Sequence, residues 1–263
     1  MNLDLRGKHA LVCGGSQGIG RAAAIELAQL GADVTVLARS AQALQSVVAA
    51  LPKTHPVQSH SCIVADANDH DGMRAALENL VQTRPVQILI NNSGGPPGGP
   101  AHSAKVEDYV STFRQHLGAS QIALQAVLPG MRAAGFGRVV NVISTSVKEP
   151  IENLGVSNTV RAAVAAWAKT CSRELAPFGI TVNNVLPGFT KTQRLTSLIA
   201  AKAKASGKSE DAIAQEMLAA VPAARFADAA ELASVVAFLC TPAAAYVNGV
   251  SIAVDGGRTH ALS

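Results

Sequence analysis

The chain of 263 residues is poor in aromatic and in charged side chains. Aromatic residues make up 3% of it and charged residues 15%, and the net charge of +4 is not concentrated in any run. Nucleic-acid surfaces need clustered cations and aromatic stacking platforms, so we expect no nucleic-acid partner. The weak positive charge would suit a small anionic ligand, although it is not specific to one.

Cysteine is also scarce. Cys13, Cys62, Cys171 and Cys240 are widely spaced, without a Cys-x-x-Cys pair and without a histidine at metal-ligand spacing. We therefore expect reduced, mostly buried thiols and no metal centre. Residues 1–13 lack the apolar core of a signal peptide, and no apolar run approaches the roughly 18–20 residues that cross a bilayer. These absences predict a cytoplasmic protein without a membrane partner.

Apolar material is plentiful, because 48% of the residues are hydrophobic. Short β-branched runs alternate with longer stretches of helical periodicity, which predicts a parallel sheet with helices on both faces and right-handed crossovers. We predict an α/β, Rossmann-like, doubly wound sheet of seven parallel strands in a single domain, 1–263. The expected strands are 9–13, 33–38, 61–65, 87–91, 138–143, 180–186 and 251–254, and the expected helices are 21–30, 41–51, 72–82, 106–134, 160–175 and 229–240.

Two segments break this alternation. The stretch "SGGPPGGPAHS", residues 93–103, is rich in glycine and proline and predicts a loop at a strand end. The segment 191–226 is polar, rich in alanine and helical in its pattern. Because it follows a strand end, we expect it to form a lid over a substrate site; a solvated pair of helices is the alternative.

The strongest motif lies near the N-terminus. In "LVCGGSQGIGRAAAIELAQLG" an apolar run leads into Gly14, Gly18 and Gly20, and a helical pattern follows at once. Glycines let a backbone turn tightly and approach a diphosphate, and a helix N-terminus offers free N–H groups and a partial positive charge. This strand–turn–helix context predicts a dinucleotide-binding site.

The end of the next expected strand selects between two cofactors. An acidic residue there would bind the ribose 2′-hydroxyl of NAD(H), whereas a cation neutralises the 2′-phosphate of NADP(H). The strand ends at Ala38, and Arg39 follows it. We therefore expect NADP(H) to be preferred over NAD(H).

Four motifs have the spacing of one known family. The turn "CGGSQGIG" is similar to T-G-x-x-x-G-x-G with Cys13 in place of threonine, "DA" at 66–67 to an adenine-contacting Asp-Val, "NNSG" at 91–94 to N-N-A-G, and "PGFTKT" at 187–192 to P-G-x-x-x-T. Together they resemble the short-chain dehydrogenase/reductase family, of the 3-oxoacyl-carrier-protein-reductase-like kind, through nearly the whole chain. The resemblance implies cofactor contacts from Gly14, Ser16, Gln17, Gly18, Ile19, Gly20, Arg39, Asp66, Ala67, Asn92, Ser93, Gly94, Arg161, Pro187, Gly188, Thr190 and Thr192.

The resemblance is incomplete at the catalytic positions, which in the family hold Asn, Ser, Tyr and Lys. Ser144, in "GRVVNVIST", matches the serine that polarises a carbonyl. Ser157 and Arg161 stand where Tyr-x-x-x-Lys is usual, and His116 takes the asparagine position. An aliphatic hydroxyl is a far weaker acid than a phenol, whose pKa is about 10, and an arginine stays charged. Ser157 and Arg161 are therefore expected to bind the ribose and favour negative charge rather than to move protons.

Another group must then handle the proton. His116 is the best-matched candidate, because imidazole titrates near pH 6.5. Lys148 and Glu149 are second candidates, on a loop that the resemblance places over the nicotinamide. In the alternative interpretation His116 only bonds a helix carbonyl, and Lys148 and Glu149 form a solvated pair. Tyr109 and Tyr246 fall outside the motif positions.

These observations predict an NADP(H)-dependent oxidoreductase that moves a hydride to or from a small carbonyl, hydroxyl or imine substrate, with Ser144, His116, Ser157 and Arg161 at its catalytic centre. Two alternatives stay open: a catalytically weak or inactive NADP-binding sensor or partner subunit, and a lyase or isomerase on the same scaffold. The segments "RFADAAELASVVAFL" and "VNGVSIAVDGG" resemble the family's tetramer-forming tail. A homotetramer, or a homodimer, is therefore expected.

Overall fold

A parallel sheet of seven strands forms the centre of the computed structural model, which describes residues 1–262. The strands lie in the order β3-β2-β1-β4-β5-β6-β7, and each neighbouring pair is parallel. The order reverses between β1 and β4, and open α/β sheets bind ligands at the carboxyl ends of the strands beside such a switch point. The strands are β1 His9–Cys13, β2 Asp33–Ala38, β3 His60–Val64, β4 Ile88–Asn91, β5 Gly137–Val142, β6 Ile180–Pro187 and β7 Ser251–Val254.

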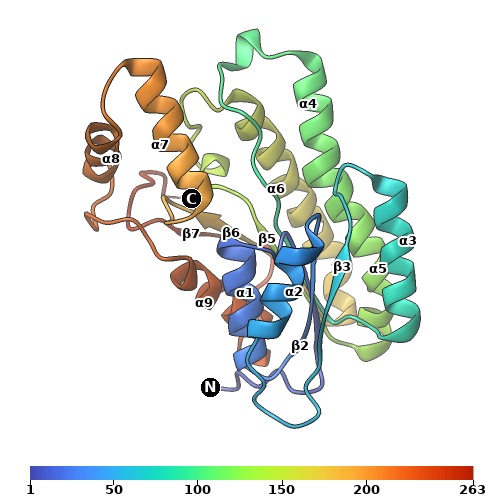
Figure 1. Ribbon diagram of the computed structural model, residues 1–263. Helices are drawn as coiled ribbons and strands as arrows, with labels where there is room; N and C mark the ends of the chain where they lie inside the picture. The colour runs from blue at the N-terminus through green and yellow to red at the C-terminus, as the bar shows by residue number, and fades with distance from the viewer. Residues whose placement is uncertain (263) are drawn as a thin grey trace.

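Helices cover both faces of this sheet (Figure 1). The helices packed on one face are α1 Gly18–Gln29, α2 Ala41–Ala50 and α9 Ala229–Cys240. Those on the opposite face are α3 His70–Thr83, α5 Ala119–Ala134 and α6 Gly155–Leu175, and α4 Val106–Phe113 packs against α6.

The central strands contribute to two apolar cores, one on each face. Val12 and Ile90 are fully buried in the core that α1 and α9 complete. Leu11 and Leu89, one residue away on the same strands, are fully buried in the core that α3, α5 and α6 complete. Successive side chains on a strand point to opposite faces, so a sheet covered on both faces needs continuous apolar runs. This is why the strands read as unbroken β-branched segments.

A buried row of polar side chains crosses four of the strands. Asn91 Nδ2 donates to Asn141 Oδ1 at 2.9 Å, Asn141 Nδ2 donates to Asn184 Oδ1 at 2.9 Å, and Asn184 Nδ2 donates to Ser251 Oγ at 3.0 Å. Buried polar groups that satisfy one another in this way hold a single register. The row fixes β4, β5, β6 and β7 relative to one another, and it begins at Asn91, the last residue of β4.

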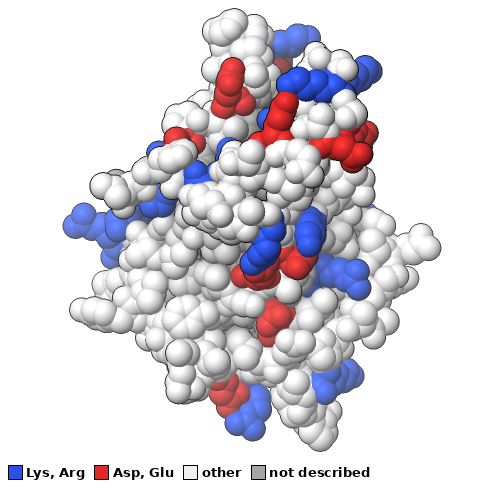
Figure 2. All heavy atoms as spheres, turned by 90° about the vertical axis from the view of Figure 1, so that its left-hand side faces the viewer, with Lys and Arg blue, Asp and Glu red and all other residues white. Residues whose placement is uncertain are grey.

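Two further helices, α7 Gln193–Ser206 and α8 Glu210–Ala219, form a separate lobe beside the sheet (Figure 1). They have a small core of their own, built on Leu195, Ala203, Ile213 and Met217. The two ends of the segment 191–226, which contains both helices, lie together, because the Lys191 amide donates to the Ala227 carbonyl at 2.8 Å. The face that carries this lobe has scattered charges of both signs, separated by wide uncharged areas (Figure 2).

The predicted fold class and single domain are confirmed, and each strand lies within one residue of its predicted bounds. The helix expected over 106–134 is interrupted by a π-helical turn, Arg114–Gly118. The helix expected over 160–175 begins earlier, at Gly155, so Ser157 and Arg161 occupy its first two turns. Within residues 1–262, no helix combines the length and apolar character that crossing a bilayer requires.

Candidate active site

A cavity of about 1550 Å³ lies at the carboxyl ends of the central strands. The segments that follow all seven strands, the π-helical turn, α6 and α7 contribute to its wall. Of the residues that the sequence predicted for the site, all line this cavity except Gly20 and the two second candidates for proton transfer, Lys148 and Glu149. The lining residues among those predicted are Gly14, Ser16, Gln17, Gly18, Ile19, Arg39, Asp66, Ala67, Asn92, Ser93, Gly94, His116, Ser144, Ser157, Arg161, Pro187, Gly188, Thr190 and Thr192.

The glycine turn after β1 packs directly against the end of β4. Gly14 has a φ of 61°, and a β-carbon on it would lie 2.5 Å from the Asn92 carbonyl oxygen. Asn92 Nδ2 donates to the Gly14 carbonyl at 3.1 Å and holds this contact. Gly20 lies behind the turn, where a β-carbon would collide with the Gly14 carbonyl, so it shapes the turn without facing the cavity.

The N-terminus of α1 is open toward the cavity. Gln17 precedes the helix and makes no side-chain cap, and the first turn holds no acidic residue. A helix N-terminus in this state has unpaired N–H groups and attracts an anion. A β-carbon on Gly18 would lie 3.3 Å from Thr192 Cγ2, so the absence of a side chain leaves the space between the helix N-terminus and Thr192 open to a ligand. The residues present therefore fit the diphosphate of a dinucleotide.

Arg39 and Asp66 follow neighbouring strands and line the same cavity. Arg39 comes directly after β2, is exposed, and forms no salt bridge within the part of the chain that the structure describes. Ala38, the last residue of β2, provides no carboxylate beside it. Asp66 Oδ1 accepts from the Asn68 amide at 2.9 Å, which orients this carboxylate after β3. A free cation without a neighbouring acid at the end of β2 fits a 2′-phosphate.

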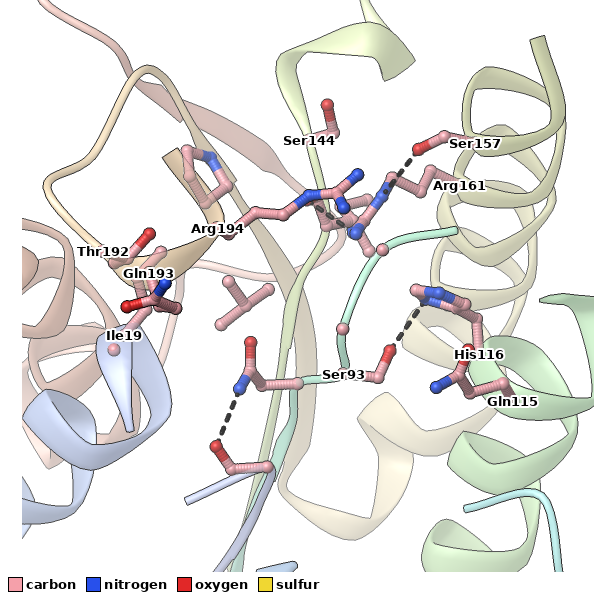
Figure 3. Close-up of a pocket in the computed structure, with 18 of the residues that line it drawn as sticks. Ile19, Ser93, Gln115, His116, Ser144, Ser157, Arg161, Thr192, Gln193 and Arg194 are labelled. Atoms are coloured by element: carbon pink, nitrogen blue, oxygen red, sulfur yellow. Dashed lines mark hydrogen bonds between the residues drawn. The ribbon is translucent and has the colours of Figure 1, made fainter. Parts of the chain in front are cut away.

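Ser144 stands on the turn after β5 and is half-buried. Its Oγ accepts from the Ser146 amide at 3.1 Å, so its own hydroxyl proton remains free to donate. The Arg161 guanidinium supports the same turn, because Nη1 donates to the Ile143 carbonyl at 2.6 Å. Arg161 Nε donates to Ser157 Oγ at 3.2 Å, one helical turn away (Figure 3). Arg161 therefore links α6 to the serine turn.

Burial governs the charge of this arginine. Arg161 is 9% exposed, and burial, with a smaller contribution from the nearby charge of Arg194, lowers its pKa to about 10. The group still carries its charge near neutral pH. It is thus a cation held inside the cavity wall beside both serines, as the sequence predicted for an electrostatic role rather than for proton transfer.

His116 corrects the expectation of a group that titrates near neutral pH. It is 5% exposed, and burial, followed by the charge of Arg161, lowers its pKa to about 3. Nδ1 lies 2.8 Å from Ser93 Oγ, while Nε2 is buried without a partner among the described residues (Figure 3). The imidazole is therefore neutral at working pH. It can serve as a proton relay or a hydrogen-bonding group, but it does not act as a charged imidazolium acid.

The two second candidates for proton transfer, Lys148 and Glu149, do not line the cavity. Glu149 accepts hydrogen bonds from His260 instead, at 3.1 Å from the backbone amide and at 3.4 Å from the ring, and the amide bond chiefly lowers the pKa of the carboxyl. Tyr109 donates to the Ala101 carbonyl at 3.2 Å, Tyr246 is fully exposed, and neither lines the cavity.

The sequence reasoning missed several lining residues, and three of them bear on the charge of the site. Arg194 begins α7 and donates from Nη2 to the Pro96 carbonyl at 2.9 Å. Arg258, beyond β7, lies over the Phe189 ring at 4.3 Å and donates to Thr145 Oγ1 at 3.4 Å. Gly95 faces both Arg194 and Arg161. The two arginines come from α7 and from the segment after β7, and local periodicity does not place such segments over a site.

All four cysteines are free, as expected, and Cys13, Cys171 and Cys240 are buried. Burial raises the pKa of the Cys13 thiol, which lines the cavity, to about 12. Among residues 1–262, no three His, Cys, Asp or Glu side chains gather as metal ligands would.

The fold and the site define a dinucleotide-binding protein of the Rossmann class, with an anion-binding helix terminus at the switch point of a doubly wound sheet. Residues 8–203 match the family model described as short chain dehydrogenase. NADPH-dependent reductase BacG of Bacillus subtilis is 30% identical over 255 residues, which cover 96% of this chain and 98% of that protein. The 3-oxoacyl-(acyl-carrier-protein) reductase FabG of Pseudomonas aeruginosa is 33% identical over 259 residues, which cover 97% and 98%.

A solved structure agrees with these matches. L-sorbose reductase from Gluconobacter frateurii, complexed with NADPH and L-sorbose, is 28% identical, has a TM-score of 0.92 and aligns over 100% of both chains. The chain belongs to the short-chain dehydrogenase/reductase family.

Proposed function

We propose that the protein is an NADP(H)-dependent oxidoreductase that transfers a hydride to or from a carbon atom of a small carbonyl, hydroxyl or imine compound. One observation carries the proposal: the open N-terminus of α1, the cation Arg39 and the donor Ser144 line the same cavity. The printed names of relatives support it, since one is an NADPH-dependent reductase and another is a reductase complexed with NADPH.

Each part of the cofactor has residues that suit it. The amides of Gly18 and Ile19 at the start of α1 would bind the diphosphate, and Arg39 would bind the 2′-phosphate. Asp66 and Ala67 would contact the adenine, and the segment 187–192 the nicotinamide carboxamide. When bound, the cofactor supplies or accepts the hydride.

Ser144 donates a hydrogen bond to the oxygen or nitrogen of the reacting group, where negative charge develops during hydride addition. Arg161, fixed by Ile143 and Ser157, places a positive charge beside the same region. Neither Ser157 nor Arg161 suits proton delivery. We propose that Ser93 and neutral His116, which are hydrogen-bonded, relay a proton between the reacting group and water in the cavity, each group taking up one proton as it gives up another.

The segment 191–226 is proposed as the substrate lid. Its helix α7 faces the cavity through Arg194, Leu195, Leu198 and Lys202, and its ends meet at one backbone bridge between Thr190 and Ala227. Because this segment has a small core of its own and its two ends lie close together, it can move as a unit. Closure would exclude water from the substrate.

The protein is also proposed to be a homotetramer or a homodimer. Helix α4 presents Val106, Val110 and Phe113 on one face, with 70%, 54% and 45% of each residue exposed. Apolar side chains at this spacing form a stripe that a second copy can cover.

Hydride transfer tests the proposed activity. A panel of ketones, alcohols and cyclic imines is followed by the absorbance of NADPH. We expect turnover of at least one compound, and Ser144→Ala should lower kcat by about 10²–10³-fold, as for other lost oxyanion donors. Ser172→Ala, a buried serine outside the cavity, is the control and should retain wild-type turnover.

Two other results would contradict this activity. Tight NADPH binding with no turnover of any compound would favour a cofactor sensor or partner subunit. Conversion of a compound without any change in nicotinamide redox state would favour a lyase or isomerase.

A further inference from the structure

Two guanidinium groups converge at one point of the cavity wall. A β-carbon on Gly95 would lie 3.2 Å from Arg194 Nη2 and 3.5 Å from Arg161 Nη2, so both nitrogens border the space that this glycine leaves free. The two side chains come from α7 and α6 and point toward each other over the cavity (Figure 3). Two guanidinium groups this close to one glycine repel each other, so the arrangement needs a negatively charged partner.

The protein offers these arginines no carboxylate. Neither forms a salt bridge within residues 1–262, and their protein partners are neutral: Ser157 and Ile143 for Arg161, Pro96 for Arg194. Arg161 is more than nine-tenths buried, and a buried charge without a counter-ion is costly. The cost is explained if an anion enters the cavity and pairs with both groups.

The rest of the charged lining points the same way. Arg258 and Lys202 add two further cations to the cavity wall, with Arg258 held against Phe189. The acidic residues in the lining are Asp66, which follows β3, and Glu152, which is exposed. Helix α1 and Arg39 already serve the phosphates of the proposed cofactor. The ribose hydroxyls that Arg161 is expected to bind are neutral, so the positive charge of the arginine pair is left for the substrate.

We propose that the substrate carries an anionic oxyacid group, a carboxylate or a phosphate, that is bound between Arg161 and Arg194 over Gly95. Guanidinium groups bind such oxygens through paired, charge-assisted hydrogen bonds. The group anchors the substrate while its reacting carbon lies toward Ser144, on the turn that Arg161 itself supports. Since Arg194 belongs to α7, the anion would also draw the lid onto the cavity. That the bound anion belongs to a substrate rests on the proposed function, whereas the anion-binding site itself does not.

Calorimetric titrations test the anion site directly. Sodium oxalate, inorganic phosphate and neutral acetamide are titrated separately into the full-length protein saturated with NADP⁺. We expect oxalate or phosphate to bind one per chain, and acetamide not to bind. Arg194→Gln should lower the affinity for the anion at least about tenfold, because a charge-assisted hydrogen bond is lost. Lys204→Gln, an exposed cation on the same helix but outside the cavity lining, is the matched control and should stay within about twofold of the wild type.

Three results would overturn the proposal: absence of binding by both anions, unchanged anion affinity in Arg194→Gln, or an Arg194→Gln variant whose main defect is at least about tenfold weaker NADPH binding. The last would assign the arginine pair to the cofactor. Preference for oxalate over phosphate, or the reverse, identifies the oxyacid.

Paired substrates separate this inference from the proposed activity. Each oxo acid or phosphorylated ketone is assayed beside its neutral counterpart, a methyl ester or the free ketone. A higher kcat/KM for the anionic member, lost in Arg194→Gln, supports both ideas. Turnover confined to the neutral compounds would contradict the anion site and support the oxidoreductase activity. Anion binding without turnover of any compound would support the anion site and contradict the oxidoreductase activity.

Discussion

His116 and Arg161 together set the charge of one part of the candidate active site. The histidine is neutral because burial, and then the charge of Arg161, lower its pKa to about 3. The arginine stays charged because burial lowers its pKa only to about 10. This part of the cavity therefore combines a buried cation with a neutral imidazole over a wide pH range. Under the proposed function, protons pass through neutral donors, namely Ser93, Ser144 and His116.

The buried histidines also make the stability depend on pH. Burial lowers the pKa of His116 to about 3 and that of His9 to about 4, whereas an unfolded histidine titrates near 6.5. Between these values the unfolded chain binds more protons, so the free energy of unfolding rises with pH, by up to about 1.4 kcal/mol per pH unit for each histidine.

We therefore expect His116→Gln to reduce the slope of unfolding free energy against pH between pH 4.5 and 6, as measured by urea denaturation. His102→Gln, at an exposed position, is the control and should keep the wild-type slope. An unchanged slope in His116→Gln would mean that the buried imidazole is not held neutral.

At the scale of elements, the π-helical turn between α4 and α5 is what the sequence did not predict. The pattern over 106–134 is that of one continuous helix, because a single inserted residue shifts the periodicity too little to be recognised. In the structure the turn carries His116 into the cavity, and side chains satisfy its carbonyls: Ser120 Oγ donates to His116 at 2.7 Å, and His70 Nε2 bonds the Arg114 carbonyl at 2.9 Å. Tertiary contacts, rather than local sequence, place this turn.

Helix α4 provides the test of assembly. The exposed stripe of Val106, Val110 and Phe113 should be buried against a second copy, so Val110→Glu would place a charge in an apolar interface. We expect light scattering to give a tetramer or dimer for the wild type and a smaller particle for this variant. Val57→Glu, at an exposed valine between α2 and β3, should leave the mass unchanged. A monomeric wild type at micromolar concentration would rule out the assembly.

At the scale of the whole molecule, the sequence predicted the sheet and the cofactor half of the cavity well. Both depend on short-range signals, the β-branched runs and the glycine turn, whose positions relative to each other follow from the doubly wound topology. The substrate half was predicted less well. Arg194 and Arg258 reach the cavity from α7 and from the segment after β7, and Glu149 bonds to His260, 111 residues away. Packing between distant segments decides such positions, and one sequence read alone does not contain it.

The account depends above all on the binding of NADP(H) at the α1 terminus and Arg39, and calorimetry with NADPH and NADH in parallel tests this most directly. The account predicts one NADPH per chain, bound at least about tenfold more tightly than NADH, because Arg39 forms charge-assisted hydrogen bonds to the 2′-phosphate. No association with either dinucleotide, or a preference for NADH, would contradict it.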